Sequence, residues 1–221
     1  AAFRLGASFG FRMFECDVKL SADGEPFLMH DAEMARTTSG KGLVVDKSWD
    51  ELSRLDAGSW HSAPYAGEPL LRLESLARWL MANALMVNLE IKPNPGQEDL
   101  TGEVVAQRVA RLWKGQAVLP LLSSFSVDAL QAAKQAQPAL PRALLLEEFR
   151  AGWLGEALAL DCVAVVGHHP HLTAENIAQA HEAGLRVLTY TVNDLARAEV
   201  LWAEGLDGLI TDAVDRLGPV S

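Results

Sequence analysis

From about residue 73 to residue 212, short strand-like runs alternate with amphipathic, helix-like runs. Apolar strands joined by helices are typical of a parallel sheet that is covered by helices, as either a closed barrel or an open doubly wound sheet. No glycine-rich phosphate loop follows any predicted strand, which favours a TIM (β/α)8 barrel. The predicted strands are 87–92, 119–125, 143–146, 162–166, 186–192 and 208–212, and the predicted helices include 100–113, 126–135, 173–183 and 194–204.

An N-terminal hairpin precedes this pattern. Residues 14–20 alternate between apolar and polar, residues 27–30 form a second strand-like run, and Asp23-Gly24 between them predicts a two-residue loop. In that register Asp17 lies opposite His30, and Glu15 shares their face because side chains repeat every second residue. The hairpin is therefore predicted to gather two carboxylates and an imidazole, unless this face is merely solvated.

The run 87–92 places a second set of charged side chains on one face of a strand. Asn88, Glu90 and Lys92 alternate with apolar residues that would pack against helices. Buried glutamate and lysine are rare unless they are paired or bind a metal, so the charged face is not an ordinary core. The alternative is an edge strand with a solvated face. Cys16 is expected to point away from Asp17, toward the helices, as a small buried apolar residue.

These groups fit two kinds of chemistry. Three carboxylates without a Cys or His cluster at zinc spacing favour Mg²⁺ or Ca²⁺, and a cation beside Lys92 could bind phosphate while His30 moves a proton. This combination indicates a metal-assisted phosphodiesterase or phosphatase. Alternatively, Lys92 could form a Schiff base, as in class I aldolases. Borohydride trapping would support the aldolase, and loss of activity on chelation would support the metal enzyme.

The composition of the chain limits the partners and the cellular compartment that we expect for the protein. A formal charge of −10 and a pI near 5.0 argue against nucleic-acid or anionic-membrane partners. Two cysteines are most simply assigned to a reducing cytoplasm. No linker-like stretch divides residues 1–221, so we expect one domain. The sequence leaves open whether the protein is a homo-oligomer.

Two further features bear on the site. His168-His169-Pro170-His171 resembles a metal cluster, but it is predicted to lie in a loop without a nearby acidic set. This favours a role at the surface or the rim, with contact to a substrate head group as the alternative. Asp31 follows His30 directly and could orient it, but as a sequence neighbour it is rather expected to cap or bind the backbone of the next turn. Residues 1–7 read as the second half of a helix, and seven predicted parallel strands are one fewer than a closed barrel requires. We therefore infer that the first barrel strand is missing and that the N-terminus is clipped or unrecorded.

Taken together, the motifs resemble a known family over essentially the whole chain. They are Glu15-Cys16-Asp17-Val18, the Asp23-Gly24 turn, His30-Asp31, residues 36–42, Asn88-Leu89-Glu90-Ile91-Lys92, Ser123-Ser124-Phe125, Thr191-Val192-Asn193 and Thr211-Asp212. In this order and spacing they look like the glycerophosphodiester phosphodiesterases, and most like the short bacterial cytosolic branch. The resemblance implies a TIM barrel with a small hairpin-containing insertion at about residues 20–73. It also implies hydrolysis of a small-molecule glycerophosphodiester to sn-glycerol 3-phosphate and an alcohol.

The resemblance also implies a role for each matching residue. Glu15, Asp17 and Glu90 match divalent-metal ligands, His30 matches one of two catalytic histidines, and Lys92 matches the phosphate-binding lysine. Phe125 and Tyr190 match aromatic positions that bind substrate. The family's His-Arg-Gly and Pro-Glu-Asn-Thr motifs, which include the partner histidine, do not occur in this sequence. An inactive relative that only binds phosphodiesters therefore remains a second alternative.

Overall fold

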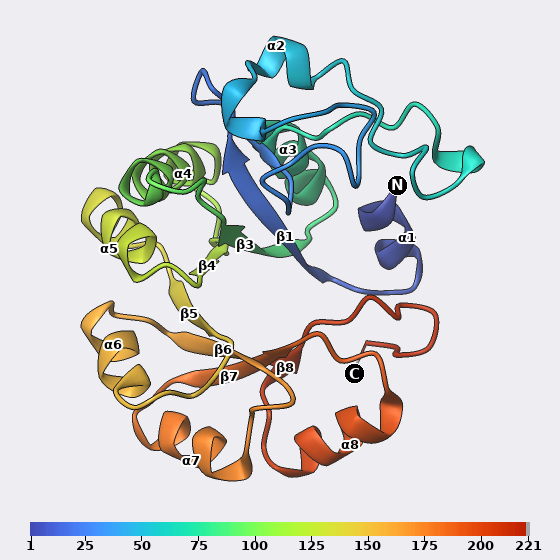
Figure 1. Ribbon diagram of the computed structural model, residues 1–221. Helices are drawn as coiled ribbons and strands as arrows, with labels where there is room; N and C mark the ends of the chain where they lie inside the picture. The colour runs from blue at the N-terminus through green and yellow to red at the C-terminus, as the bar shows by residue number, and fades with distance from the viewer. Residues whose placement is uncertain (220–221) are drawn as a thin grey trace.

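The computed structural model describes residues 1–219. A curled sheet occupies the centre of the molecule, and helices α3 to α8 surround its outer face (Figure 1). The strands are β1 Met13–Leu20, β2 Pro26–Leu28, β3 Met86–Ile91, β4 Leu121–Ser124, β5 Arg142–Leu146, β6 Ala164–His168, β7 Arg186–Tyr190 and β8 Gly208–Leu209. The helices are α1 Ala2–Ser8, α2 Trp49–Leu52, α3 Leu73–Ala82, α4 Glu98–Leu112, α5 Val127–Ala136, α6 Trp153–Ala159, α7 Ala174–Glu182 and α8 Leu195–Ala203.

The sheet has the order β2-β1-β3-β4-β5-β6-β7-β8, and every pair except β1–β2 is parallel. This curled parallel sheet with an outer layer of helices is a TIM-type α/β barrel, as the alternating pattern predicts. Within residues 1–219, β1 and β8 are not paired with each other. In the same part of the chain, no helix is both long and apolar enough to span a bilayer.

Alternation along the strands divides the side chains between the barrel interior and the helices. On β1 and β3 the outward residues, such as Val18 and Leu89, are fully buried against the helices. Cys16 belongs to this outer layer, as predicted. Glu15, Asp17, Asn88 and Glu90 face inward. The inward residues of β5 to β7 are apolar except at the carboxyl ends of the strands, where His168 and Tyr190 lie; the apolar ones are Ala143, Leu145, Ala164, Val166 and Leu188. The interior is therefore polar on the side of β1 and β3 and apolar on the opposite side.

The predicted register of the N-terminal hairpin is wrong by one residue. The observed pairs are Val18 with Leu28, Lys19 with Phe27 and Leu20 with Pro26, so Asp17 does not lie opposite His30. Ser21 and Gly24 close a turn through Gly24 N–H and Ser21 C=O at 2.9 Å, and Gly24 has φ +76°. A turn followed by a left-handed glycine makes a three-residue loop, which shifts the pairing by one. A shift of this kind reverses the face on which each later side chain lies.

The segment between β1 and α3 has a small core of its own. Phe27, Met34, Val44 and Leu52 are buried together, apart from the main layers. A backbone hydrogen bond of 2.9 Å from Leu28 N–H to Leu71 C=O connects the two ends of this segment. The segment lies beside the C-terminal end of β1 in Figure 1. It therefore places the loop that carries His30 at the carboxyl end of the barrel strands.

Candidate active site

Three carboxylates meet inside the barrel, on neighbouring strands. In the parallel register Asp17 is paired with Glu90, and Glu15 is paired with Asn88. One carboxylate oxygen from each of Glu15, Asp17 and Glu90 lies within 4.8 Å of the others, and we call these three residues the acidic cluster. The predicted convergence of these three groups is confirmed: alternation turns each side chain inward, and the pairing of β1 with β3 brings the strands together.

Lys92 is the counter-charge of this cluster. Its Nζ lies 2.9 Å from Asp17 Oδ1 and 3.3 Å from Glu90 Oε1. Burial lowers the pKa of the ammonium, but Asp17 and Glu90 outweigh this effect and leave the pKa above its ordinary value. Lys92 therefore stays charged. A second lysine, Lys19, is 3 % exposed and donates to the Lys92 carbonyl at 3.3 Å. Sequence reasoning missed Lys19, although its position two residues after Asp17 places it on the same face of the strand.

Two ammonium groups, of which only that of Lys92 is paired with the cluster, do not balance three carboxylates in a buried setting. Burial, together with the nearby carboxylates of Asp17 and Glu90, raises the pKa of Glu15 to about 8. Burial also raises the pKa of Glu90 to about 7, although Lys92 opposes the rise. Nearby, the side-chain amide of Asn88 and the hydroxyl of Ser123 are buried without a hydrogen-bond partner in the described structure. Crowded oxygen donors of this kind fit a hard divalent cation with solvent or substrate around it.

His30 is placed differently from the prediction. It lies in the loop after β2 with its side chain 60 % exposed, and its Nδ1 is 2.7 Å from Asp31 Oδ1. Asp31 also accepts two bonds from Arg36, at 2.5 and 2.9 Å, so its expected role in the backbone of the next turn is wrong. The bond from Arg36 holds the pKa of Asp31 well below its ordinary value, with a further contribution from His30. An ionised Asp31 fixes the proton on Nδ1 and leaves Nε2 as the free ring nitrogen of His30.

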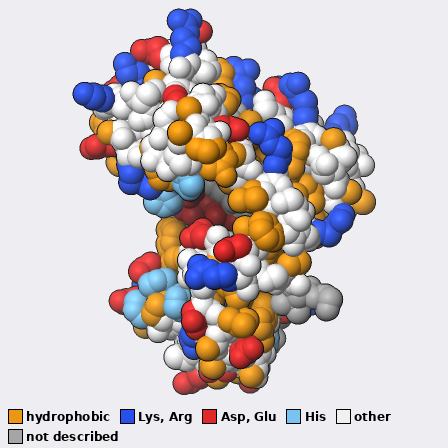
Figure 2. Space-filling model, turned by 90° about the vertical axis from the view of Figure 1, so that its right-hand side faces the viewer, with side chains coloured by type: hydrophobic (Ala, Val, Ile, Leu, Met, Phe, Trp, Pro, Cys, Tyr) orange, Lys and Arg blue, Asp and Glu red, His pale blue; other side chains and the backbone are white. Residues whose placement is uncertain are grey.

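The two predicted aromatic residues come together at the mouth of the barrel. Phe125 follows β4 and Tyr190 ends β7, and their rings are 5.8 Å apart in an edge-to-face arrangement. Phe125 is 44 % exposed, whereas Tyr190 packs partly against the apolar half of the interior. Figure 2 shows a hollow in one face of the molecule, with acidic side chains at its floor and histidines at its margins.

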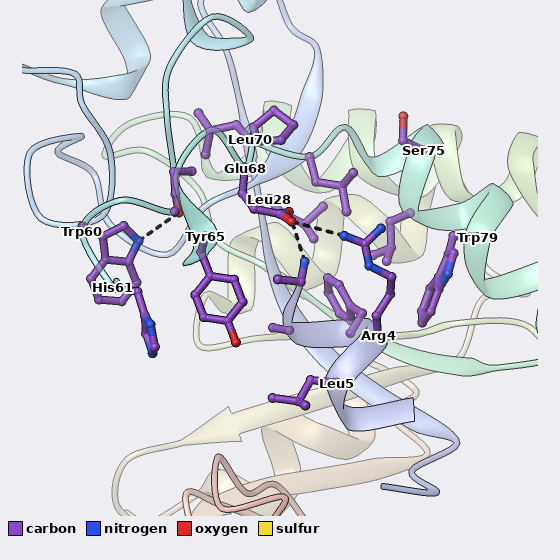
Figure 3. A pocket seen from close by; sticks show the side chains of 18 residues that line it. Arg4, Leu5, Leu28, Trp60, His61, Tyr65, Glu68, Leu70, Ser75 and Trp79 are labelled. Carbon is purple, nitrogen blue, oxygen red and sulfur yellow. Dashed lines mark hydrogen bonds and ion pairs between the residues drawn. The ribbon is translucent and has the colours of Figure 1, made fainter. Parts of the chain in front are cut away.

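A separate cavity of about 580 Å³ lies between α1, the loop 57–71 and α3. Figure 3 shows Trp60, His61 and Tyr65 on one side of it and Trp79 on another, while Arg4 reaches Glu68 across 3.2 Å. None of the predicted site residues lines this cavity. The lining is mostly apolar and aromatic, and the carboxylate of Glu68 is paired with Arg4, so the cavity lacks the group of neighbouring carboxylates found inside the barrel.

An acidic cluster with a lysine at the carboxyl end of barrel strands is typical of a (β/α)-barrel enzyme. The comparisons with known proteins define the family. Residues 1–216 match the model of the glycerophosphoryl diester phosphodiesterase family, and the chain belongs to that family.

Individual relatives agree with this assignment. The Bacillus subtilis (strain 168) protein YhdW is 30% identical over 221 residues, which cover 97% of this chain and 88% of the relative. A glycerophosphodiester phosphodiesterase of Caldanaerobacter subterraneus is 28% identical over 221 residues, covering 98% of this chain and 88% of its own. A solved structure of an Oleispira antarctica phosphodiesterase, in complex with the product sn-glycerol-3-phosphate, has a TM-score of 0.90 and 31% identity and covers 97% of this chain and 86% of that chain.

Proposed function

We propose that the protein hydrolyses glycerophosphodiesters to sn-glycerol 3-phosphate and an alcohol. Family membership and the similarity to the product-bound Oleispira antarctica structure support this activity. The observation that carries the proposal is the acidic cluster, within 4.8 Å, together with Lys92 at 2.9 Å from Asp17. In the reaction, water adds to phosphorus, the bond from phosphorus to the alcohol oxygen breaks, and the alcohol leaves with a proton.

We assign Glu15, Asp17 and Glu90 as ligands of one divalent cation, Mg²⁺ or Ca²⁺. The all-oxygen donor set and the unbalanced negative charge fit a hard cation. A cation bound there would supply positive charge to a non-bridging phosphoryl oxygen. Lys92 binds a second phosphate oxygen through its ammonium group, which the acidic cluster keeps protonated.

His30 moves the proton that the attacking or the leaving oxygen requires, through the Nε2 that Asp31 leaves free. Phe125 and Tyr190 contact the carbon skeleton of the substrate from the mouth of the barrel. We also propose that residues 1–221 act as one phosphodiesterase barrel, in which the insertion at about residues 20–73 supplies His30. The substrate would be a small molecule in the cytoplasm. Neither a nucleic acid nor a membrane would be a partner, in line with the charge of −10.

The aldolase alternative finds no support at Lys92. A Schiff-base lysine must lose its proton to become a nucleophile, and its pKa is usually lowered by a desolvating or cationic environment. Here the neighbouring carboxylates hold the pKa of Lys92 above its ordinary value. The remaining alternative, an inactive relative that only binds phosphodiesters, is distinguished by the assay itself.

The test measures release of glycerol 3-phosphate from glycerophosphocholine, with Mg²⁺ or Ca²⁺ added and again after treatment with EDTA. Turnover that is lost on chelation and restored by the cation supports the proposal. Because the His-Arg-Gly motif does not occur in residues 1–221, the assay is also run on the full reading frame, and substrate binding without turnover in both identifies the inactive relative. Trapping by borohydride in the presence of a carbonyl substrate, with no phosphodiester cleavage, would overturn the proposal in favour of the aldolase.

A further inference from the structure

A second cluster of potential metal ligands lies at the mouth of the barrel. Glu147 directly follows β5, His168 is the last residue of β6, and His171 lies in the loop that follows. One ligand atom from each of the three lies within 4.8 Å of the others, and we call these residues the rim cluster. The prediction that the histidines lack an acidic neighbour is therefore wrong. His168 also belongs to the strand, because β6 ends two residues later than predicted.

The side chains of the rim cluster are oriented by other groups. His171 Nδ1 lies 2.6 Å from the backbone carbonyl of Glu147 and must donate to it, which leaves a lone pair on Nε2. The hydroxyl of Tyr190 donates to Glu147 Oε2 at 3.0 Å and holds one side of the carboxylate. A ligand histidine whose other ring nitrogen donates to a carbonyl, beside a carboxylate that is itself hydrogen-bonded, is the usual supporting arrangement around a bound metal.

His168 supplies the third donor, and one of its ring nitrogens lacks a hydrogen-bond partner among the described residues. Its Nδ1 is buried and makes no hydrogen bond in the described structure, although it lies 3.2 Å from Glu147 Oε1. The two atoms are close enough to attract each other but are misaligned for a hydrogen bond. The imidazole is also fixed in place, because it stacks on Tyr190 with ring centres 5.4 Å apart. A buried ring nitrogen without a partner requires one, and a shared cation would satisfy it together with Glu147 and His171.

We propose that Glu147, His168 and His171 bind one Zn²⁺ ion at the mouth of the barrel. Two imidazoles and one carboxylate form a donor set that favours zinc and similar transition metals over Mg²⁺ or Ca²⁺. The acidic cluster has the opposite preference because all its donors are oxygen atoms. Three protein ligands leave a fourth tetrahedral position open toward the barrel mouth, and the ion would join the ends of β5 and β6 to the following loop.

The experiment measures Zn²⁺ binding to the metal-stripped full chain by calorimetry, with excess Mg²⁺ present to occupy the acidic cluster. Replacing Zn²⁺ by Co²⁺ should produce the visible absorption of a tetrahedral site. His168→Ala and His171→Ala should each weaken Zn²⁺ binding by more than the roughly 10- to 100-fold that is typical of losing a supporting residue. His169→Ala, which removes an imidazole from the same tetrapeptide (residues 168–171) but not from the rim cluster, should bind Zn²⁺ as the original protein does.

Zn²⁺ binding is read without catalysis, so its failure is distinct from failure of the proposed hydrolysis. Unchanged Zn²⁺ affinity in both His168→Ala and His171→Ala would overturn the proposal. The same conclusion follows if His169→Ala loses as much affinity as these variants. Loss of the Zn²⁺ site in Glu90→Gln alone would assign the ion to the acidic cluster, and absence of any binding would show that Glu147 and His168 form only an ion pair.

Discussion

At the scale of single residues, Glu90 is the carboxylate through which the acidic cluster can be tested most cleanly. It is 8 % exposed, it faces Asp17 across two paired strands, and burial raises its pKa to about 7. Glu90→Gln keeps the size of the side chain but removes its charge. We expect turnover of glycerophosphocholine to fall by at least about 10²-fold, a loss typical of removing one preorganised group that stabilises charge.

The stability of Glu90→Gln provides the control. Removing a crowded buried charge should leave the free energy of unfolding of the metal-free protein unchanged or slightly higher, and a urea titration measures it. The far-ultraviolet circular dichroism spectrum should be unchanged. Full activity in a folded Glu90→Gln protein would contradict the role of the acidic cluster.

His30 is the second residue that can be tested alone. A positioned acid or base usually contributes about 10²- to 10⁴-fold, so His30→Ala should lower kcat by that order while the affinity for Mg²⁺ changes little. Asp31→Asn keeps the histidine but removes the charge that fixes its proton, and it should lower kcat by roughly 10-fold or more. Steady-state kinetics on both variants, at saturating substrate, measures these effects. Near-normal turnover of His30→Ala would exclude His30 as the proton-transfer group.

Sequence reasoning succeeded at these residues where it needed only strand alternation. Glu15, Asp17, Glu90 and Lys92 lie on two adjacent strands, so their side-chain directions follow from counting by two. Counting residues across the hairpin gave the wrong partner for His30, because the left-handed conformation of Gly24 adds a residue to the hairpin loop. The rim cluster was missed because the contact between Glu147 and His168 depends on how β5 and β6 end relative to each other, which alternation does not fix.

At the scale of elements, α4 and α5 approach each other closely at a single glycine. A Cβ on Gly102 would lie 2.1 Å from the carbonyl oxygen of Ala129. Alanine is a better helix former by about 1 kcal/mol, but a clash with backbone costs more, typically about 1–3 kcal/mol. We expect Gly102→Ala to lower the free energy of unfolding despite its higher helix propensity.

Gly155 in α6 is a matched control, because nothing lies within 4 Å of a Cβ added there. Gly155→Ala should therefore raise the free energy of unfolding by about 0.4–1 kcal/mol. Urea titrations of the two variants should shift in opposite directions. A stabilising Gly102→Ala would show that the two helices can move apart at little cost.

The elements were predicted well where the pattern was local. Strand and helix types follow from hydrophobic periodicity, and β7 begins at the predicted residue, Arg186. The sequence predicts the ends of the strands less well. The strand predicted at 208–212 is observed only over Gly208–Leu209, as β8, although the apolar run continues. A strand ends where its neighbour ceases to offer hydrogen bonds, and that depends on the whole sheet rather than on the segment.

At the scale of the whole molecule, Asp207 joins elements at the end of the barrel opposite the site. It accepts bonds from the backbone N–H of Val187 at 2.8 Å and from Arg186 at 2.6 Å, and it lies 2.8 Å from His181 Nε2 on α7. Burial raises the pKa of Asp207, but these bonds outweigh it and leave the pKa below its ordinary value of 3.8. The ionised carboxylate therefore stabilises the folded state, and this contribution is present above pH 3.8 and is lost as the pH falls through the lower folded pKa.

Asp207→Asn should lower the free energy of unfolding at pH 7 by about 1–3 kcal/mol, the usual worth of hydrogen bonds to a charged group. The difference between variant and original protein should narrow as the pH falls below 3.8. Urea titrations at neutral and acid pH measure it, and kcat at pH 7 should be unchanged because Asp207 lies far along the strands from the acidic cluster. An equal difference at both pH values would mean that the charge of Asp207 is not what stabilises the fold.

The barrel interior is charged on the side of β1 and β3 and apolar on the side of β5 to β7, so it offers two chemically different walls to a bound ligand. If Lys92 binds the phosphate as proposed, an amphiphilic substrate would lie with its ionic end on that side and its carbon skeleton toward side chains such as Leu145 and Leu188. The two halves are then separable in evolution. Substitutions on β5 to β7 can alter which alcohol is accepted, while the strands that cleave the phosphodiester bond stay as they are.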